Sequence, residues 1–204
     1  ADFAREPQVV EVTIHDKKFT IINNHLKSKF VKNGRAMYAA GGDRRIEFFA
    51  GALKARRRIS AEAFRIRQYI DAILEANPDE LLIVTGDLND GPGTDFFERN
   101  FLTHSVVDRI FGSIFKRGNQ LTHVLLHGDS HDYTAQFHDF IENETRDLIL
   151  DHIGLSPAIA NRWDWNGRVA VAEYEAQIVN GNQLEDRDKL PSDHRPVVAE
   201  INLH

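Results

Sequence analysis

The distribution of apolar and polar residues predicts strands and helices that follow one another along the chain. Val9–Ile14 is rich in β-branched residues and predicts a strand. Phe19–Asn23 predicts a second strand, and the polar turn between the two indicates a hairpin. Apolar residues then recur every three or four positions over residues 59–73, which predicts a helix ending at Asn77 and Pro78.

The remaining segments complete an α/β pattern. Residues 81–84 are wholly apolar, which is typical of a strand buried on both faces. Residues 30–57 are polar and contain four glycines, so we expect a long loop there, and we expect short helices and loops over 94–145. A strand, a long helix and a buried strand in succession predict an α/β fold. Further strands are predicted at residues 148–155, 169–178 and 197–203.

The composition is ordinary for a globular domain, because hydrophobic residues make up 42% and charged residues 27% of the 204 residues. No apolar run approaches the roughly 20 residues that a spanning helix needs, so we expect no membrane span. Cysteine is absent, which excludes disulfides and thiolate chemistry. Composition alone therefore favours a single domain and leaves its function open.

The charge is distributed unevenly along the chain. Residues 17–67 contain 14 lysines and arginines and only three acids, although the whole chain has a net charge of −6. A basic region on an acidic chain can attract a polyanion to one face. A solvated loop and helix face explains the same pattern equally well.

Polar residues cluster at the ends of the predicted strands, where sites assemble in α/β sheets. Asp87 and Asn89 are two positions apart and face the same side of an extended segment. Asp151 lies within the apolar segment LILDHIGL, and a buried carboxylate requires a donor such as an imidazole N–H. Asp193 and His194 are adjacent and point in opposite directions if extended, so one can bind a metal while the other faces a substrate.

Taken singly, each of these residues has an ordinary explanation. Asp87 and Asn89 are common turn residues, Asp193 could cap a turn, and His25 could be a buried structural histidine. Together they form four polar clusters in chain order, which makes coincidence a poor explanation.

The four clusters lie in segments that resemble the ordered motifs of the endonuclease/exonuclease/phosphatase superfamily, a family similar to pancreatic deoxyribonuclease. The segments are NHLKSK at 24–29, GDLN at 86–89, LDHI at 150–153 and SDHRP at 192–196. The match runs from about residue 9 to the C-terminus. The resemblance implies a four-layered α/β sandwich, with two sheets flanked by helices, that cleaves phosphate esters with Mg²⁺ or Mn²⁺.

The resemblance also implies a role for each polar residue. His194 would be the general base on the attacking water, and Asp151 would bind its other ring nitrogen and stabilise the imidazolium. Asp193 would lie at the metal. The residues expected to position the water or to contact the phosphate are Asp87, Asn89 and His25.

The favoured function is therefore a metal-dependent phosphodiesterase that acts on nucleic acid. The basic stretch favours this substrate, and the cations expected to bind it are Lys27, Lys29, Arg56, Arg57 and Arg58. The first alternative is a phosphatase or a phospholipase C-like hydrolase of the same superfamily. The second alternative is a non-catalytic fragment or binding module.

One part of the family pattern has no counterpart in this chain. In the family, an Asn and then a Glu, the main metal ligand, precede the histidine motif. Here Glu6 is followed by a proline and Glu11 lies within a predicted strand, so neither fits that position. We therefore expect the domain to be truncated at its N-terminus, and this chain alone to bind Mg²⁺ poorly. We also expect it to self-associate or to need a missing segment of a longer, full-length protein.

A rival metal site is suggested by His123, His127 and His131, which are spaced by four residues and would align on a helix. Gly128 and Asp129 interrupt such a helix. A zinc site at these histidines is therefore the weaker hypothesis.

Overall fold

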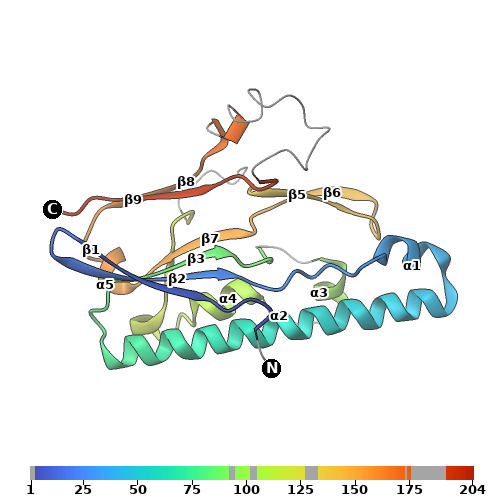
Figure 1. The fold of residues 1–204 in the computed structure, drawn as a ribbon, viewed down its shortest axis with the longest axis horizontal. Helices are drawn as coiled ribbons and strands as arrows, with labels where there is room; N and C mark the ends of the chain where they lie inside the picture. Colours follow the sequence, from blue (N-terminus) through green and yellow to red (C-terminus); the bar gives the residue numbers. More distant parts are fainter. Residues whose placement is uncertain (1–2, 92–94, 102–104, 127–132, 173, 176–191) are drawn as a thin grey trace.

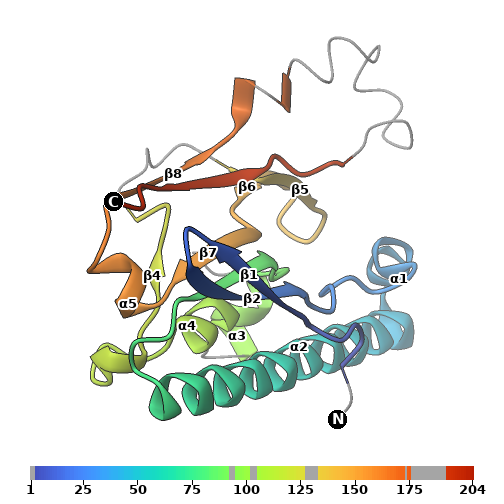
Figure 2. The same cartoon turned by 60° about the vertical axis from the view of Figure 1, so that its left-hand side comes forward.

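Figure 1 shows the protein as a computed structural model, which describes residues 3–204 apart from 92–94, 102–104, 127–132, 173 and 176–191. A five-stranded sheet has the strand order β1-β2-β3-β7-β4. The helix α2 (Gly42–Ala76) lies along one face of this sheet, and the pair β8 (Trp165–Val169) and β9 (Val197–Ile201) lies over the other (Figures 1 and 2). The sheet consists of β1 (Gln8–Ile14), β2 (Lys17–His25), β3 (Leu82–Asp87), β7 (Asp151–Leu155) and β4 (Thr122–His123).

The first two strands form the predicted hairpin, and the buried strand predicted at 81–84 is β3. β1 and β2 pair antiparallel through a turn at His15 and Asp16, both of which have positive φ. β2 and β3 pair parallel, so the chain between them must cross over the sheet. This crossover brings the carboxyl ends of β2 and β3 to the same edge.

The helix predicted over residues 59–73 is present, but it is much longer than expected. α2 (Gly42–Ala76) has 35 residues and Asn77 is its C-cap, which agrees with the predicted end at Asn77 and Pro78. Together with α1 (Gly34–Ala40) it occupies most of the stretch 30–57, so the long loop expected there is wrong. The helix continues because Phe48 and Ala52 extend its buried face towards the N-terminus.

A second, two-stranded sheet is formed by β8 (Trp165–Val169) and β9 (Val197–Ile201), which pair antiparallel. Side chains of β9 pack against a buried cluster on the face of the larger sheet that β8 and β9 cover. The short helix α5 (Pro157–Ala160) closes the end of this cluster. The buried members are Phe19, Leu81, Val124, Leu155, Ile159 and Trp163.

Two predicted strands differ from the observed ones. The strand expected at 148–155 is divided, because β6 (Glu144–Leu148) ends where it was to begin and β7 starts at Asp151. The strand expected at 169–178 is wrong over its described part, because only Val169 lies in a strand. Residues 171, 172, 174 and 175 are helical, and residues 176–178 lie outside the described residues.

The segment from 94 to 145 contains short elements, as expected, and it also contains a hairpin that the sequence did not predict. β5 pairs antiparallel with β6. The described helices include none that is long and apolar enough to cross a bilayer. With three sheets among the described residues and helices packed against them, the predicted α/β sandwich is confirmed. The short elements are α3 (Phe96–Phe101), α4 (Val106–Phe111), η1 (Arg117–Asn119), β4 and β5 (Ala135–Asp139).

Candidate active site

Three polar residues lie side by side at one edge of the five-stranded sheet. His25 is the last residue of β2 and is paired in register with Asp87, the last residue of β3. Asp87 is in turn paired with Asp151, the first residue of the antiparallel strand β7. Backbone pairing alone therefore brings three of the four motifs together.

The fourth motif reaches this edge from the other sheet. His194 precedes β9, and its Nδ1 lies 2.8 Å from Oδ2 of Asp151, within hydrogen-bond distance. Thr134, which is fully buried, fixes the two partners relative to each other. Its hydroxyl accepts the backbone N–H of Asp151 at 3.2 Å, and its carbonyl accepts the N–H of Arg195 at 2.7 Å. No periodicity or motif in the sequence points to Thr134.

Residues from all four motifs line a pocket of about 380 Å³. The sequence-based expectation that the motif residues share one pocket, with Asp151 in hydrogen-bond reach of His194, is confirmed. Arg5, Ser28 and Ser192 also line the pocket and were not predicted. The motif residues in the lining are His25, Asp87, Asn89, Asp151, Asp193 and His194.

Arg5 reaches the pocket because the short N-terminal segment is anchored on α2. Phe3 packs against the buried cluster that includes Ile59, Ile66 and Leu82. The guanidinium of Arg65 lies 4.7 Å from the centroid of the Phe3 ring. The N–H of Ala4 donates to Glu62 Oε1 at 2.8 Å, while the other oxygen of this buried carboxylate accepts the N–H of Lys27 at 3.0 Å. Glu62 thus joins the segments on either side of β1 and β2. A single arginine in an exposed segment carries no sequence signal of this placement.

The loop after β3 has a conformation that requires its particular residues. Gly86 has φ 125°, and a Cβ there would lie 1.9 Å from the carbonyl oxygen of Asn24. Asn89 has φ 51° and donates to both oxygens of Asp87, through its N–H at 2.8 Å and its side-chain amide at 2.9 Å. The same amide donates to the carbonyl of Leu26 at 3.0 Å. Asn89 therefore orients Asp87 and ties the loop to the end of β2.

The carboxylates and the imidazole shift each other's protonation. Burial raises the pKa of Asp87, the N–H of Asn89 opposes this, and the negative charge of Asp151 raises it further. The hydrogen bond that His194 donates to Asp151 raises the pKa of His194, partial burial opposes this, and the charges of Asp151, Asp87 and Asp193 add to the rise. The exposed imidazole of His25 has its Nε2 3.6 Å from Oδ2 of Asp87.

Asp87, Asp151 and His194 form a group that could hold a metal ion, since one ligand atom of each lies within 4.8 Å of the others. Two carboxylates suit a hard divalent cation that keeps several of its waters. Asp193, expected at the metal, lies outside this group, with its Oδ1 3.9 Å from Nε2 of His194 and its side chain half exposed. Glu11 is exposed on β1 and forms an ion pair with Lys18. The expected glutamate ligand of the metal, N-terminal to the histidine motif, stays a prediction.

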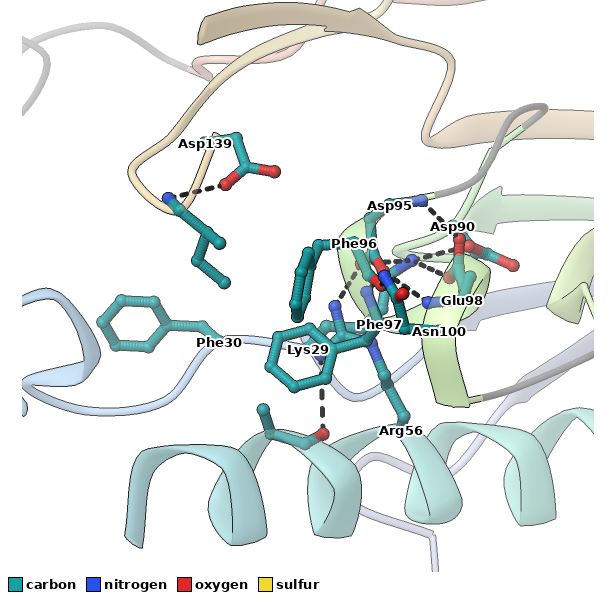
Figure 3. Close-up of polar contacts among 12 residues, drawn as sticks. Lys29, Phe30, Arg56, Asp90, Asp95, Phe96, Phe97, Glu98, Asn100 and Asp139 are labelled. Carbon is teal, nitrogen blue, oxygen red and sulfur yellow. Dashed lines mark hydrogen bonds and ion pairs between the residues drawn. The ribbon is translucent and has the colours of Figure 1, made fainter. Parts of the chain in front are cut away.

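Two of the cations expected to bind substrate are engaged inside the fold. Nζ of Lys29 lies 2.7 Å from Oδ1 of Asp90 and 2.8 Å from Oε1 of Glu98. Arg56 is buried over the ring of Phe97 at 4.2 Å and is paired with an aspartate of the α3 segment. Figure 3 shows these side chains gathered above α2. We therefore do not assign substrate contacts to Lys29 or Arg56, whereas Arg57 and Arg58 are exposed and Lys27 is partly exposed.

The charge of Lys29 is maintained by its partners. Burial opposes the ammonium, but the carboxylates of Asp90 and Glu98 outweigh this effect and the pKa of Lys29 is raised. The lysine is thus a permanently charged link between three segments of the chain.

His123, one of the three histidines considered for zinc, is paired with another histidine. Its Nε2 lies 2.8 Å from Nδ1 of His152, and its Nδ1 accepts the N–H of Leu125. Burial and the neighbouring His152 lower the pKa of His123 to about 4, so the ring is neutral near pH 7. His127 and His131 lie outside the described residues, so the spacing argument for zinc stays untested there.

The comparison with solved structures agrees with this architecture. SmcL matches with 15% identity and a TM-score of 0.52, over 95% of this chain and 57% of its own length. The form named beta toxin 275-280 from Staphylococcus aureus matches with 16% identity and a TM-score of 0.51, over 94% of this chain and 55% of its own. No family model matches the chain, and no curated protein matches it.

These likenesses bear on the fold. The chain shares its α/β fold with these two proteins. Its membership of the endonuclease/exonuclease/phosphatase superfamily, which the four motifs predict, stays a prediction. The chain spans little more than half the length of each of the two matched proteins. The activity, the substrate and the partners are therefore proposals, argued from the pocket.

Proposed function

We propose that the pocket hydrolyses phosphodiester bonds in nucleic acid with the help of a divalent cation, Mg²⁺ or Mn²⁺. The observation that supports this best is the hydrogen bond between His194 and Asp151, placed beside Asp87 and His25 in one open pocket. A carboxylate-bound imidazole is a general base, and an exposed second imidazole opposite it is a donor for a phosphate oxygen.

Each residue has a step that its contacts allow. Asp151 holds the Nδ1–H of His194, so Nε2 is available to take a proton from the attacking water, and the carboxylate stabilises the resulting imidazolium. His25 donates to a phosphate oxygen, and Arg5 adds positive charge at the same pocket. When bound by Asp87 and Asp151, a divalent cation would stabilise negative charge on the phosphate.

The substrate class follows from the charges around the pocket. Arg5 lines it, and Lys27 and Arg58 flank the buried Glu62 that joins this edge to α2. Cations in and near a phosphoesterase pocket favour a substrate with more than one phosphate. We therefore favour nucleic acid over a phosphomonoester or a phospholipid headgroup.

The test is a metal-dependent assay of the full-length protein on DNA, RNA, bis-p-nitrophenyl phosphate, p-nitrophenyl phosphate and phosphatidylcholine vesicles. Turnover of DNA or RNA that stops on chelation supports the proposal. Turnover confined to p-nitrophenyl phosphate would favour the phosphatase, and turnover confined to the vesicles would favour the phospholipase C-like hydrolase.

Neutralising the exposed cations should weaken binding and leave the chemistry intact. For Arg57→Gln/Arg58→Gln we expect a higher KM on duplex DNA, with kcat within about threefold, because these side chains would contact phosphates away from the scissile bond. The slope of log affinity against log salt should flatten by about 0.9 for each phosphate that is no longer neutralised. Arg162→Gln removes an exposed arginine outside the basic stretch and serves as the control. An unchanged KM and salt slope would leave the basic stretch as a solvated surface.

The partnership of Asp151 and His194 should be visible in the pH profile. The pKa of His194 is raised, and the base must be neutral, so the acid limb of kcat/KM should lie above the ordinary histidine value of about 6.5. Asp151→Asn removes the main cause of the rise, so the limb should move to lower pH while kcat falls. The exposed Asp147 on β6 supplies the control variant Asp147→Asn. A limb that stays in place or moves to higher pH would contradict the pairing.

A further inference from the structure

Asp90 directly follows the GDLN motif, lies outside the pocket lining and is only 3% exposed. Each of its oxygens has a different partner. Oδ1 accepts from Nζ of Lys29 at 2.7 Å, and Oδ2 accepts the N–H of Val106 at 2.7 Å. Its backbone carbonyl lies 2.7 Å from Nε2 of His152. A carboxylate buried with this many donors is fixed in one orientation.

Two partners of Asp90 lie next in sequence to residues that line the pocket. Lys29 follows Ser28, which lines the pocket on the segment that leaves β2. His152 follows Asp151 on β7, and Asp87 and Asn89 lie within three residues on the N-terminal side of Asp90 itself. One residue therefore connects the loop after β3 to the segments on either side of it.

The hydrogen bonds of His123 and His152 form a continuous chain in which each ring donates to the next group. The N–H of Leu125 occupies Nδ1 of His123, so the neutral ring carries its proton on Nε2 and donates to Nδ1 of His152. His152 then carries its proton on Nε2 and donates to the carbonyl of Asp90. Every ring nitrogen has a partner, and the chain ends on the loop that presents Asp87.

The ammonium of Lys29 depends on the same network. It lies between Asp90 and Glu98, and Glu98 also accepts the N–H of Asp95 at 3.0 Å (Figure 3). Removing the charge of Asp90 deprives a largely buried cation of its nearest carboxylate and leaves Glu98 and, at 4.0 Å, Asp95. Removing Lys29 leaves Asp90 and Glu98 without their shared cation. Either change removes one of the links between the loop after β3 and the segment that follows β2, and leaves the contacts of Asn89 and Leu26 in place.

We propose that Asp90 and Lys29 are positioning residues for the proposed phosphoesterase site, holding the loop that carries Asp87 and Asn89 against the segment that carries His25 and Ser28. The expected effect of Asp90 and Lys29 on turnover rests on the proposed function. Their expected effect on the position of the loop rests on the contacts alone. Displacement of catalytic groups by about 1 Å can lower turnover about 100-fold.

The test uses Lys29→Met, Asp90→Asn and the double variant in the full-length protein. Each single variant should lower kcat about 10- to 100-fold with KM within about threefold, because the pocket entrance is untouched while the reacting groups shift. The double variant should be no worse than the more severe single one, because both changes remove the same ion pair. Arg67→Met is the matched control, since Arg67 of α2 is a buried, ion-paired cation that bonds to Asp71 and the carbonyl of Ile110.

A second measurement is independent of activity. Amide hydrogen exchange should accelerate at residues 87–90 in Lys29→Met and Asp90→Asn, where Asn89 N–H donates to Asp87, and should stay unchanged there in Arg67→Met. Normal kcat with unchanged exchange, or a fall in kcat no larger than in Arg67→Met at equal thermal stability, would overturn the inference. If the wild type hydrolyses nothing, the proposed function fails, and the exchange data still decide whether Asp90 and Lys29 hold the loop.

Discussion

His194→Ala should lower kcat of the full-length protein by several orders of magnitude, the largest loss expected of any single variant. Removing a general base typically costs about 10²–10⁴-fold, and here the partner carboxylate of Asp151 is also left without its donor. Asp151→Asn should lose less, because the imidazole itself remains. Steady-state kinetics on the best substrate, with thermal melting to confirm folding, measures the effect.

The control for this variant is His138→Ala, which removes an exposed histidine of β5. It should retain wild-type turnover. Near wild-type turnover in His194→Ala itself would remove the assigned base, and with it the role given to Asp151.

Asp87→Asn should lose both divalent-metal affinity and turnover, with kcat lower by about 10²–10³-fold. Asp87 contributes one of the two carboxylates of the metal-capable group and lies between His25 and Asp151 in the sheet register. The amide keeps the shape of the carboxylate and removes its charge. Calorimetric titration with Mn²⁺ and steady-state kinetics measure the two losses separately.

Asp147→Asn, an exposed change on β6, is the control for charge removal. If Asp87→Asn binds Mn²⁺ as tightly as the wild type while turnover falls, Asp87 acts on the phosphate or the water and not on the metal. Unchanged turnover would exclude Asp87 from the site.

The motif residues could be found from the sequence because each lies at a strand end, and strand ends are defined by local patterns. The apolar runs before His25 and Asp87 predict β2 and β3, and parallel pairing then places both ends at one edge. Asp151 attracts notice as an acid within an apolar segment, and its expected need for a donor is met by His194.

The basic stretch was predicted less well, because a run of charge in sequence does not say which side chains face outward. Successive helical residues point in different directions, so Arg56 is buried against the ring of Phe97 while Arg57 and Arg58 face solvent. The helix itself was missed at its N-terminal half. Gly41, with φ 70°, separates α1 from α2, and glycine-containing polar sequence resembles a loop.

The supporting contacts of the site could not be predicted at all. Thr134, Glu62 and Asp90 each join segments that are far apart in the sequence, through hydrogen bonds to backbone groups or to single side chains. Such contacts leave no periodicity, and the residue types are common in loops and on helix surfaces. They become evident only when the segments are seen together in the fold.

The central claim is that His194 directs a water molecule to phosphorus. Its most direct test is single-turnover hydrolysis of bis-p-nitrophenyl phosphate, or of the best nucleic acid substrate, in ¹⁸O-labelled water with Mg²⁺ or Mn²⁺, analysed by mass spectrometry of the phosphate product. We predict one ¹⁸O atom per phosphate product from the wild type, and a rate of labelled product from His194→Ala that is lower by about 10²–10⁴-fold. Equal rates of labelled product from the two proteins, or product without ¹⁸O, would contradict the account.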